Sequence, residues 1–199
     1  MARMKSAFEK AMERVDQLDR PNEDQLLEWK LVPQGEKLGG DFLKGSGAPF
    51  SVIDNAAPED RPYIVQGMLK VLVANIQLPK SEPVRASVDK VLGGIDRLLS
   101  GKASAKELLD RARYVITQYL ENALPQREQA FAQLKMQMEQ QVAEAMRRHQ
   151  GAAPPMNLNI ETMPEFQQQW MAISGQIDQQ YELHLSEYRT QIMGIVQNG

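Results

Sequence analysis

The sequence predicts an all-α fold, in which a helical bundle forms a base and a long antiparallel helical hairpin forms a coiled-coil-like arm. Apolar residues recur at the three- to four-residue spacing of helices along almost the whole 199-residue chain. Prolines and glycines divide this pattern into blocks of helix size. The last block has no internal proline and runs for roughly 34 residues, enough for a helix about 50 Å long.

The composition excludes several classes of protein. Hydrophobic residues make up 42% of the chain and charged residues 25%, which is typical of globular proteins and not of disordered ones. The chain has no cysteine, so thiolate metal sites and cysteine nucleophiles lack their essential residue. The beginning of the chain lacks the apolar stretch of a secretory signal. The most apolar window, Tyr63–Leu78, contains polar residues and is shorter than a membrane span. We therefore expect a cytoplasmic protein without a membrane segment.

Residues 1–124 are predicted to form the helical base. Ser6 and Glu9 have the spacing of a capping box, and an apolar helical stripe continues from there to Leu18. Asn22 can cap a short second helix, which we expect to stop before Pro33 because proline disfavours helix at the preceding residue.

Residues 32–62 interrupt the helical pattern. This segment contains five glycines and four prolines among several apolar residues. We expect an irregular segment that wraps the base, with the glycines acting as turn formers. The glycines lack the spacing of a phosphate-binding loop.

Two further helices are predicted after Pro62. Pro62 suits the first turn of a helix that is apolar on nearly all sides and should therefore lie buried at the centre. Ser81 can cap the next helix, with Pro83 in its first turn and Gly101 at its end.

Residues 125–199 are predicted to form the arm, packing back on residues 104–124. Ser104 with Glu107 resembles a capping box, and one apolar stripe then continues past Pro125, so we expect one helix kinked there or two nearly collinear helices. Thr162 with Glu165 predicts the start of the returning helix.

The returning helix shows an eleven-residue apolar repeat. Folding the two helices about the loop 150–161 predicts that Met146 meets Phe166 and that Phe131 meets Tyr181. The predicted seam of the arm comprises Phe131, Met138, Val142, Met146, Phe166, Trp170, Ile173, Ile177, Tyr181 and His184.

His184 is the only histidine in this seam, and we interpret it as a packed histidine and not as a metal ligand. His184 and Glu187 occur in the reverse order of the Glu-x-x-His pair of di-iron bundles, and that pair is not repeated. A seam histidine would make the arm sensitive to pH near 6. We expect no metal and no cofactor.

Charge is distributed unevenly. Residues 63–124 carry nine basic and six acidic groups, whereas residues 151–199 carry one basic and five acidic groups. We expect these regions to face each other. In the predicted register of the arm, Lys135 also faces Asp178. The basic groups of the middle also raise the alternative of nucleic-acid binding, through Lys80, Arg85, Lys90, Arg97, Lys102, Lys106, Arg111 and Arg113. Neighbouring acidic residues such as Asp110 compensate them locally, so nucleic acid is not the expected partner.

Four apolar residues lie at the predicted tip of the arm: Met156, Leu158, Ile160 and Met163. Two interpretations remain open. The residues form a docking point for a partner, or they fold back and cover the seam.

We expect a non-enzymatic protein that serves as a protein–protein interaction or structural adaptor through its arm, with a homodimer as the simplest assembly. One alternative is a chaperone-like clamp that grips client chains by the apolar tip. Another is a nucleic-acid- or ribosome-associated factor that uses the basic middle. No catalytic residue is predicted.

Overall fold

The computed structural model describes residues 22–148 and 159–197, and every regular element in these two ranges is a helix. This confirms the predicted all-α class. In chain order the elements are α2 (Glu23–Lys44), α3 (Pro49–Asp54), α4 (Arg61–Ala74), α5 (Glu82–Leu98), α6 (Ala103–Gln118), the π-helix η1 (Tyr119–Ala123), α7 (Leu124–Arg148), the 3-10 helix η2 (Ile160–Thr162) and α8 (Pro164–Gln197). None of these helices is long and apolar enough to cross a membrane.

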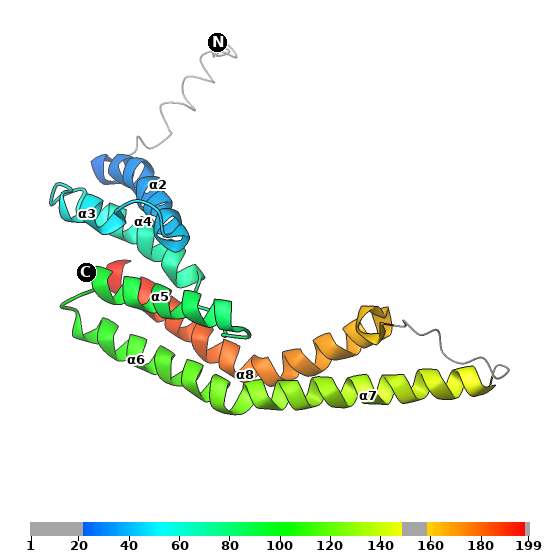
Figure 1. Ribbon diagram of the computed structural model, residues 1–199. Helices are drawn as coiled ribbons and strands as arrows, with labels where there is room; N and C mark the ends of the chain where they lie inside the picture. The colour runs from blue at the N-terminus through cyan, green and yellow to red at the C-terminus, as the bar shows by residue number, and fades with distance from the viewer. Residues whose placement is uncertain (1–21, 149–158, 198–199) are drawn as a thin grey trace, which may run out of the picture.

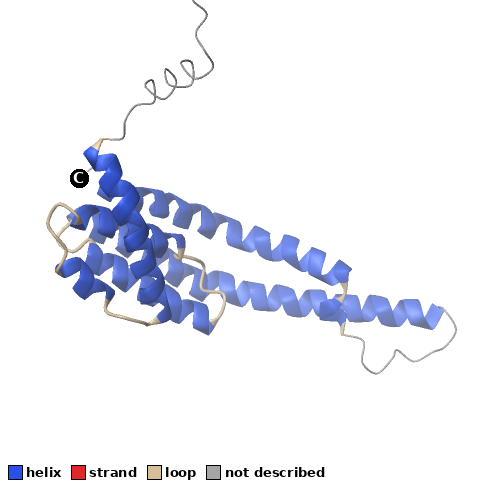
Figure 2. Cartoon of the chain, turned by 90° about the horizontal axis from the view of Figure 1, so that it is seen from above, coloured by secondary structure: helices blue, strands red, loops and turns tan. Residues whose placement is uncertain are grey.

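The helices form a base with a projecting pair. In the base, α2 lies along α4, and α4 packs on α5 and α8, while α6 packs along α8 (Figure 1). The other end of α8 and all of α7 extend away from the base, as Figure 2 shows from above. We call α7, η2 and residues 164–174 the spike.

Two apolar clusters stabilise these parts. The main core includes fully buried side chains from α4, α5, α6 and α8, among them Met68, Leu72, Ile95, Leu109, Leu185 and Ile192. This confirms that the helix beginning near Pro62 is central. The spike core is smaller and consists of buried Leu134, Met138, Ile160 and Phe166 with partly buried neighbours.

Several predicted helix starts are confirmed. Asn22 caps α2 with a reciprocal pair of hydrogen bonds, because the Gln25 N–H donates to Asn22 Oδ1 at 2.7 Å and the Asn22 N–H donates to Gln25 Oε1 at 3.0 Å. Pro62 lies in the first turn of α4, and Pro83 lies in the first turn of α5. Ser81 directly precedes α5, but its side chain makes no capping hydrogen bond, so the predicted Ser81 cap is wrong.

Two predicted capping boxes are wrong. The chain turns at Gly101, where φ is 91°, and α6 begins at Ala103, so Ser104 lies inside the helix. Thr162 belongs to η2, and its hydroxyl donates to the Asn159 carbonyl at 2.8 Å instead of capping α8. The predicted box at Ser6, with its stripe to Leu18, lies outside the described residues.

The prediction of an irregular segment over residues 32–62 is wrong for most of its length. Helix α2 does not stop before Pro33 but continues through it to Lys44, and α3 follows at Pro49–Asp54. Of the five glycines, Gly45 and Gly47 do occupy turns, with φ of 75° and 68°.

Gly35 explains why α2 continues as a helix. A Cβ atom on Gly35 would lie 2.1 Å from the Ile64 carbonyl oxygen, and one on Gly67 would lie 2.1 Å from the Val32 carbonyl oxygen. The two backbones therefore touch at reciprocal glycines, and packing against α4 stabilises the helix despite Pro33. The contact needs a residue without a side chain at both positions.

The α6–α7 rod bends before Pro125, at η1 (Figure 1). Proline cannot donate the helical hydrogen bond to the carbonyl four residues earlier, and a π-turn accommodates that loss. The predicted continuity across Pro125 is confirmed, with the π-turn as the kink.

The predicted register of the two long helices is wrong. The Phe131 ring contacts Phe166 and Trp170, at centroid distances of 5.3 and 5.1 Å, and does not meet Tyr181. Tyr181 instead contacts Tyr119 at 5.4 Å. The partner of Phe131 thus lies about three to four helical turns earlier than predicted, and α7 extends past the point where α8 begins (Figure 1).

The glycine contact gives a prediction with a matched control in the same helix. We expect Gly35→Ala to lower the free energy of unfolding by at least about 2 kcal/mol, because its methyl group would meet α4 backbone. Gly40→Ala should raise it by about 0.5–1 kcal/mol, because no atom lies within 4 Å of the added methyl. Urea unfolding followed by circular dichroism measures both. Equal effects would contradict the close backbone contact.

Candidate functional site

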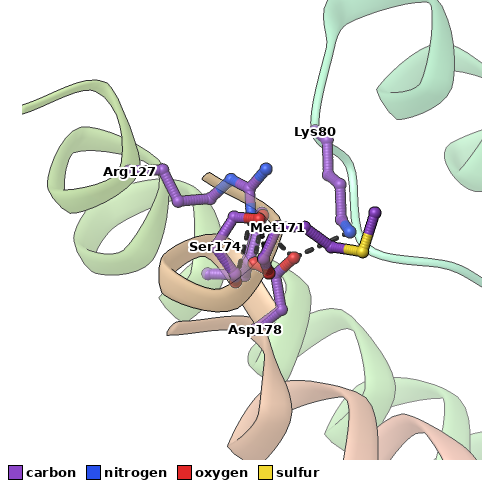
Figure 3. Close-up of polar contacts among 6 residues, drawn as sticks. Lys80, Arg127, Met171, Ser174 and Asp178 are labelled. Carbon is purple, nitrogen blue, oxygen red and sulfur yellow. Dashed lines mark hydrogen bonds and ion pairs between the residues drawn. The ribbon is translucent and has the colours of Figure 1, made fainter. Parts of the chain in front are cut away.

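A buried carboxylate lies where the spike leaves the base. Asp178 of α8 is 7% exposed and is the only buried charged residue in the ranges 22–148 and 159–196. Its Oδ1 accepts a hydrogen bond from the Tyr119 hydroxyl at 3.0 Å. Its Oδ2 lies 2.6 Å from Arg127 Nη1 and 2.7 Å from Lys80 Nζ, as Figure 3 shows. We call Lys80, Tyr119, Arg127 and Asp178 the junction.

Each member of the junction comes from a different element. Lys80 follows Pro79 in the loop between α4 and α5, Tyr119 begins η1, Arg127 lies near the start of α7, and Asp178 lies on α8. One carboxylate therefore connects the base loop, the bend of the rod and the returning helix.

Arg127 holds the two helices of the spike together at their base. Its guanidinium also donates to the Ser174 carbonyl at 3.2 Å and lies over the Trp170 ring, 5.1 Å from the centroid. The Arg127 side chain is 13% exposed, so these contacts are largely shielded from water.

Tyr119 is fully buried, and its hydroxyl requires a partner. Burial raises the pKa of Tyr119 above its ordinary value, Arg127 acts in the opposite direction, and the hydrogen bond to Asp178 raises it further. The hydroxyl therefore stays protonated through the physiological range and remains the donor to Asp178.

The contacts of the junction suit a structural role, in which they fix the position of the spike on the base. Three donors satisfy a single carboxylate, and the two cations leave one net positive charge at the site. Within the described ranges, no group of three or more His, Asp or Glu residues could hold a metal ion.

The junction was missed by the sequence analysis, which placed Asp178 opposite Lys135. Lys135 instead pairs with Glu161 at 2.6 Å. The available signal was a seven-residue spacing: the fully or nearly buried residues Asp178, Leu185 and Ile192 follow one another at that interval on α8.

The prediction of His184 as a seam residue is wrong. Its side chain is 55% exposed, and its Nδ1 lies 3.8 Å from a carboxylate oxygen of Glu187 in the same helix. The eleven-residue repeat assigned His184 to the seam together with Ile173 and Ile195, and both of these do pack in a core. At the position between them the buried side chain is that of the neighbouring Leu185.

The other predicted seam residues divide between the two cores. Phe131, Met138, Val142, Phe166, Trp170 and Ile173 belong to the spike core, whereas Ile177 and Tyr181 pack against the main core. Met146 is half-buried near the end of α7. The predicted contact of Met146 with Phe166 is absent from the register described above, in which Phe166 contacts Phe131.

Of the four predicted tip residues, Ile160 is buried at 5% exposure in the spike core and Met163 is half-buried against it. For Ile160, the structure therefore agrees with the second interpretation, in which the tip residues fold back and cover the seam. Met156 and Leu158 lie outside the described residues.

Many of the basic groups of the middle have partners. Arg111 pairs with Glu107 at 2.6 Å and Arg113 with Asp110 at 3.1 Å, both within α6. The expectation that the basic middle faces the acidic end is met at Lys80 and Asp178.

The sequence profile of one family matches residues 50–194, from α3 to near the end of α8. The chain belongs to DUF6657, a family of unknown function. No curated protein and no solved structure matches it. All four junction residues of this DUF6657 chain lie inside the matched range, whereas α2 lies outside it.

The junction predicts a graded series of stability losses. Asp178→Asn should lower the free energy of unfolding by about 3 kcal/mol, because it leaves the shielded Arg127 without its counter-charge. Tyr119→Phe should cost about 1 kcal/mol, the value of one hydrogen bond. Glu187→Gln, which removes an exposed pair, should change it by less than about 0.5 kcal/mol. Chemical denaturation measures all three. If Asp178→Asn were as mild as Glu187→Gln, the junction would not be an anchor.

Proposed function

We propose that this DUF6657 chain is a non-enzymatic interaction protein that self-associates through its spike. The observation that carries the proposal is an uncharged surface along α7, on the side opposite the spike core. This outer stripe comprises Ala132, Gln133, Met136, Gln140 and Ala143.

Helical geometry separates the outer stripe from the spike core. At 100° per residue, Met136 and Gln140 lie on the side of α7 opposite Leu134 and Met138, whose side chains are buried. Met136 is 55% exposed. A helix face that meets only water normally carries charged residues, whereas this stripe has none over about three turns.

The absence of charge favours a second copy of the chain as the partner. The uncharged centres of two identical stripes can face each other, with Glu139 and Glu144 at the edges, where water remains, and a two-fold axis places the same surface on both sides of the interface. The alanines allow close approach, the methionine supplies an adaptable apolar contact, and the glutamine amides can both donate and accept hydrogen bonds across the interface.

The junction also supports self-association, because it fixes the orientation of the spike on the base. A spike that is held at a fixed orientation by a shielded ion pair presents its outer stripe with little conformational freedom. Less entropy is then lost when a partner helix binds.

Two adjacent glutamines provide a matched test. Gln140→Glu places a charge within the stripe, whereas Gln141→Glu places the same charge on the exposed flank of α7. We expect Gln140→Glu to raise the dimer dissociation constant by at least about tenfold, because the new charge would be desolvated in the interface, and Gln141→Glu to leave it nearly unchanged. Sedimentation equilibrium measures both constants. A monomeric parent chain, or equal effects of the two changes, would contradict self-association through this stripe.

A further inference from the structure

A shallow cavity of about 300 Å³ lies beside the junction. It is lined by Lys80, Leu124, Arg127, Glu128, Phe131 and Trp170. The lining thus combines two cationic side chains with three apolar ones and one carboxylate, and it comes from the base loop, α7 and α8.

The cations of this cavity are only partly neutralised. Lys80 and Arg127 share a single carboxylate, that of Asp178, at 2.7 and 2.6 Å. Glu128 also lines the cavity, but it forms no ion pair within 4 Å with any residue of the described ranges. The Lys80 side chain is 50% exposed and can therefore reach a second anion, whereas Arg127 is largely buried against Ser174 and Trp170.

The remaining walls suit an apolar body. Phe131 and Trp170 meet edge to face at a centroid distance of 5.1 Å, and Leu124 lies nearby in the same lining. Pockets for small ligands are typically apolar with a few polar groups that fix the orientation, and this volume is at the lower end of their size range.

We infer that this cavity binds a small organic monocarboxylate with an apolar body, such as a medium-chain fatty acid or an aromatic acid. The carboxylate pairs with Lys80, and the apolar body lies against Phe131 and Trp170. Lys80 and Arg127 exceed Asp178 by one positive charge, and Glu128 in the same lining repels a dianion more strongly than a monoanion, so a single carboxylate is favoured. This site is independent of the outer stripe, which lies on the opposite side of α7.

Trp170 provides a direct readout. The chain has two tryptophans, and Trp29 on α2 is 66% exposed and distant in sequence from the cavity lining, so Trp29→Phe leaves Trp170 as the single emitter. Titration of this variant with octanoate should change Trp170 fluorescence in a saturable manner. Octanol, which has the same chain without the charge, should bind about fivefold more weakly, the upper end of the effect expected for one partly exposed ion pair.

Two variants should move octanoate affinity in opposite directions. Lys80→Met should weaken binding about fivefold, and because Arg127 still pairs with Asp178, the junction retains its shielded contact. Glu128→Gln should strengthen binding, since it removes the nearby negative charge from an exposed position. Lys106→Met, on the exposed surface of α6, should have no effect.

Three outcomes would overturn the inference. They are the absence of saturable octanoate binding in the parent chain, equal affinity for octanoate and octanol, and an unchanged affinity in both Lys80→Met and Glu128→Gln. A loss of binding in Lys106→Met equal to that in Lys80→Met would likewise assign the effect to overall charge and overturn the site.

Discussion

The Asp178 carboxylate sets the constraint on which the arrangement of this chain depends. A charged group on the apolar face of a helix loses its hydration when the helix packs, and the cost is several kcal/mol unless donors replace the water. Here the donors come from the base loop, from η1 and from α7. Sliding α8 by one turn would leave this carboxylate buried and unpaired, so the junction favours the observed position of α8 along its partners.

The junction coincides with the bend of both long helices. The rod turns at η1, and α8 bends as it passes this level (Figure 1). Ser174 and Gly175 lie in this part of α8, and serine–glycine pairs and π-turns are two recognised causes of helix bending. Arg127 donates to the Ser174 carbonyl at 3.2 Å, which offers that carbonyl a partner outside its own helix. Because of the two bends, the spike points away from the base, while the Arg127–Asp178 ion pair holds its two helices together where they leave the base.

The sequence was informative where local chemistry decides the structure. The all-α class, the cap at Asn22 and the buried helix after Pro62 each depend on residues close together in the chain, and all three are confirmed. The register of the long helices was not accessible in the same way. Both helices repeat apolar residues at every turn, so several offsets bury comparable surface, and the choice between them depends on Asp178 meeting Arg127. The continuation of α2 through Pro33 likewise depends on Gly67, a residue more than thirty positions away.

The glycine contact between α2 and α4 bears on where an independently folding unit begins. The family match starts at residue 50, after α2. Gly67, which lies inside the match, is nevertheless in close contact with the backbone of Val32 in α2. Ile64 and Met68, which are 5% and 0% exposed, flank this contact on α4. A fragment that begins at residue 50 would lack α2, and the backbone at Gly67 and the side chains of Ile64 and Met68 would then be exposed to water. The main core of this chain therefore extends beyond the range of the family match and includes Leu31 of α2.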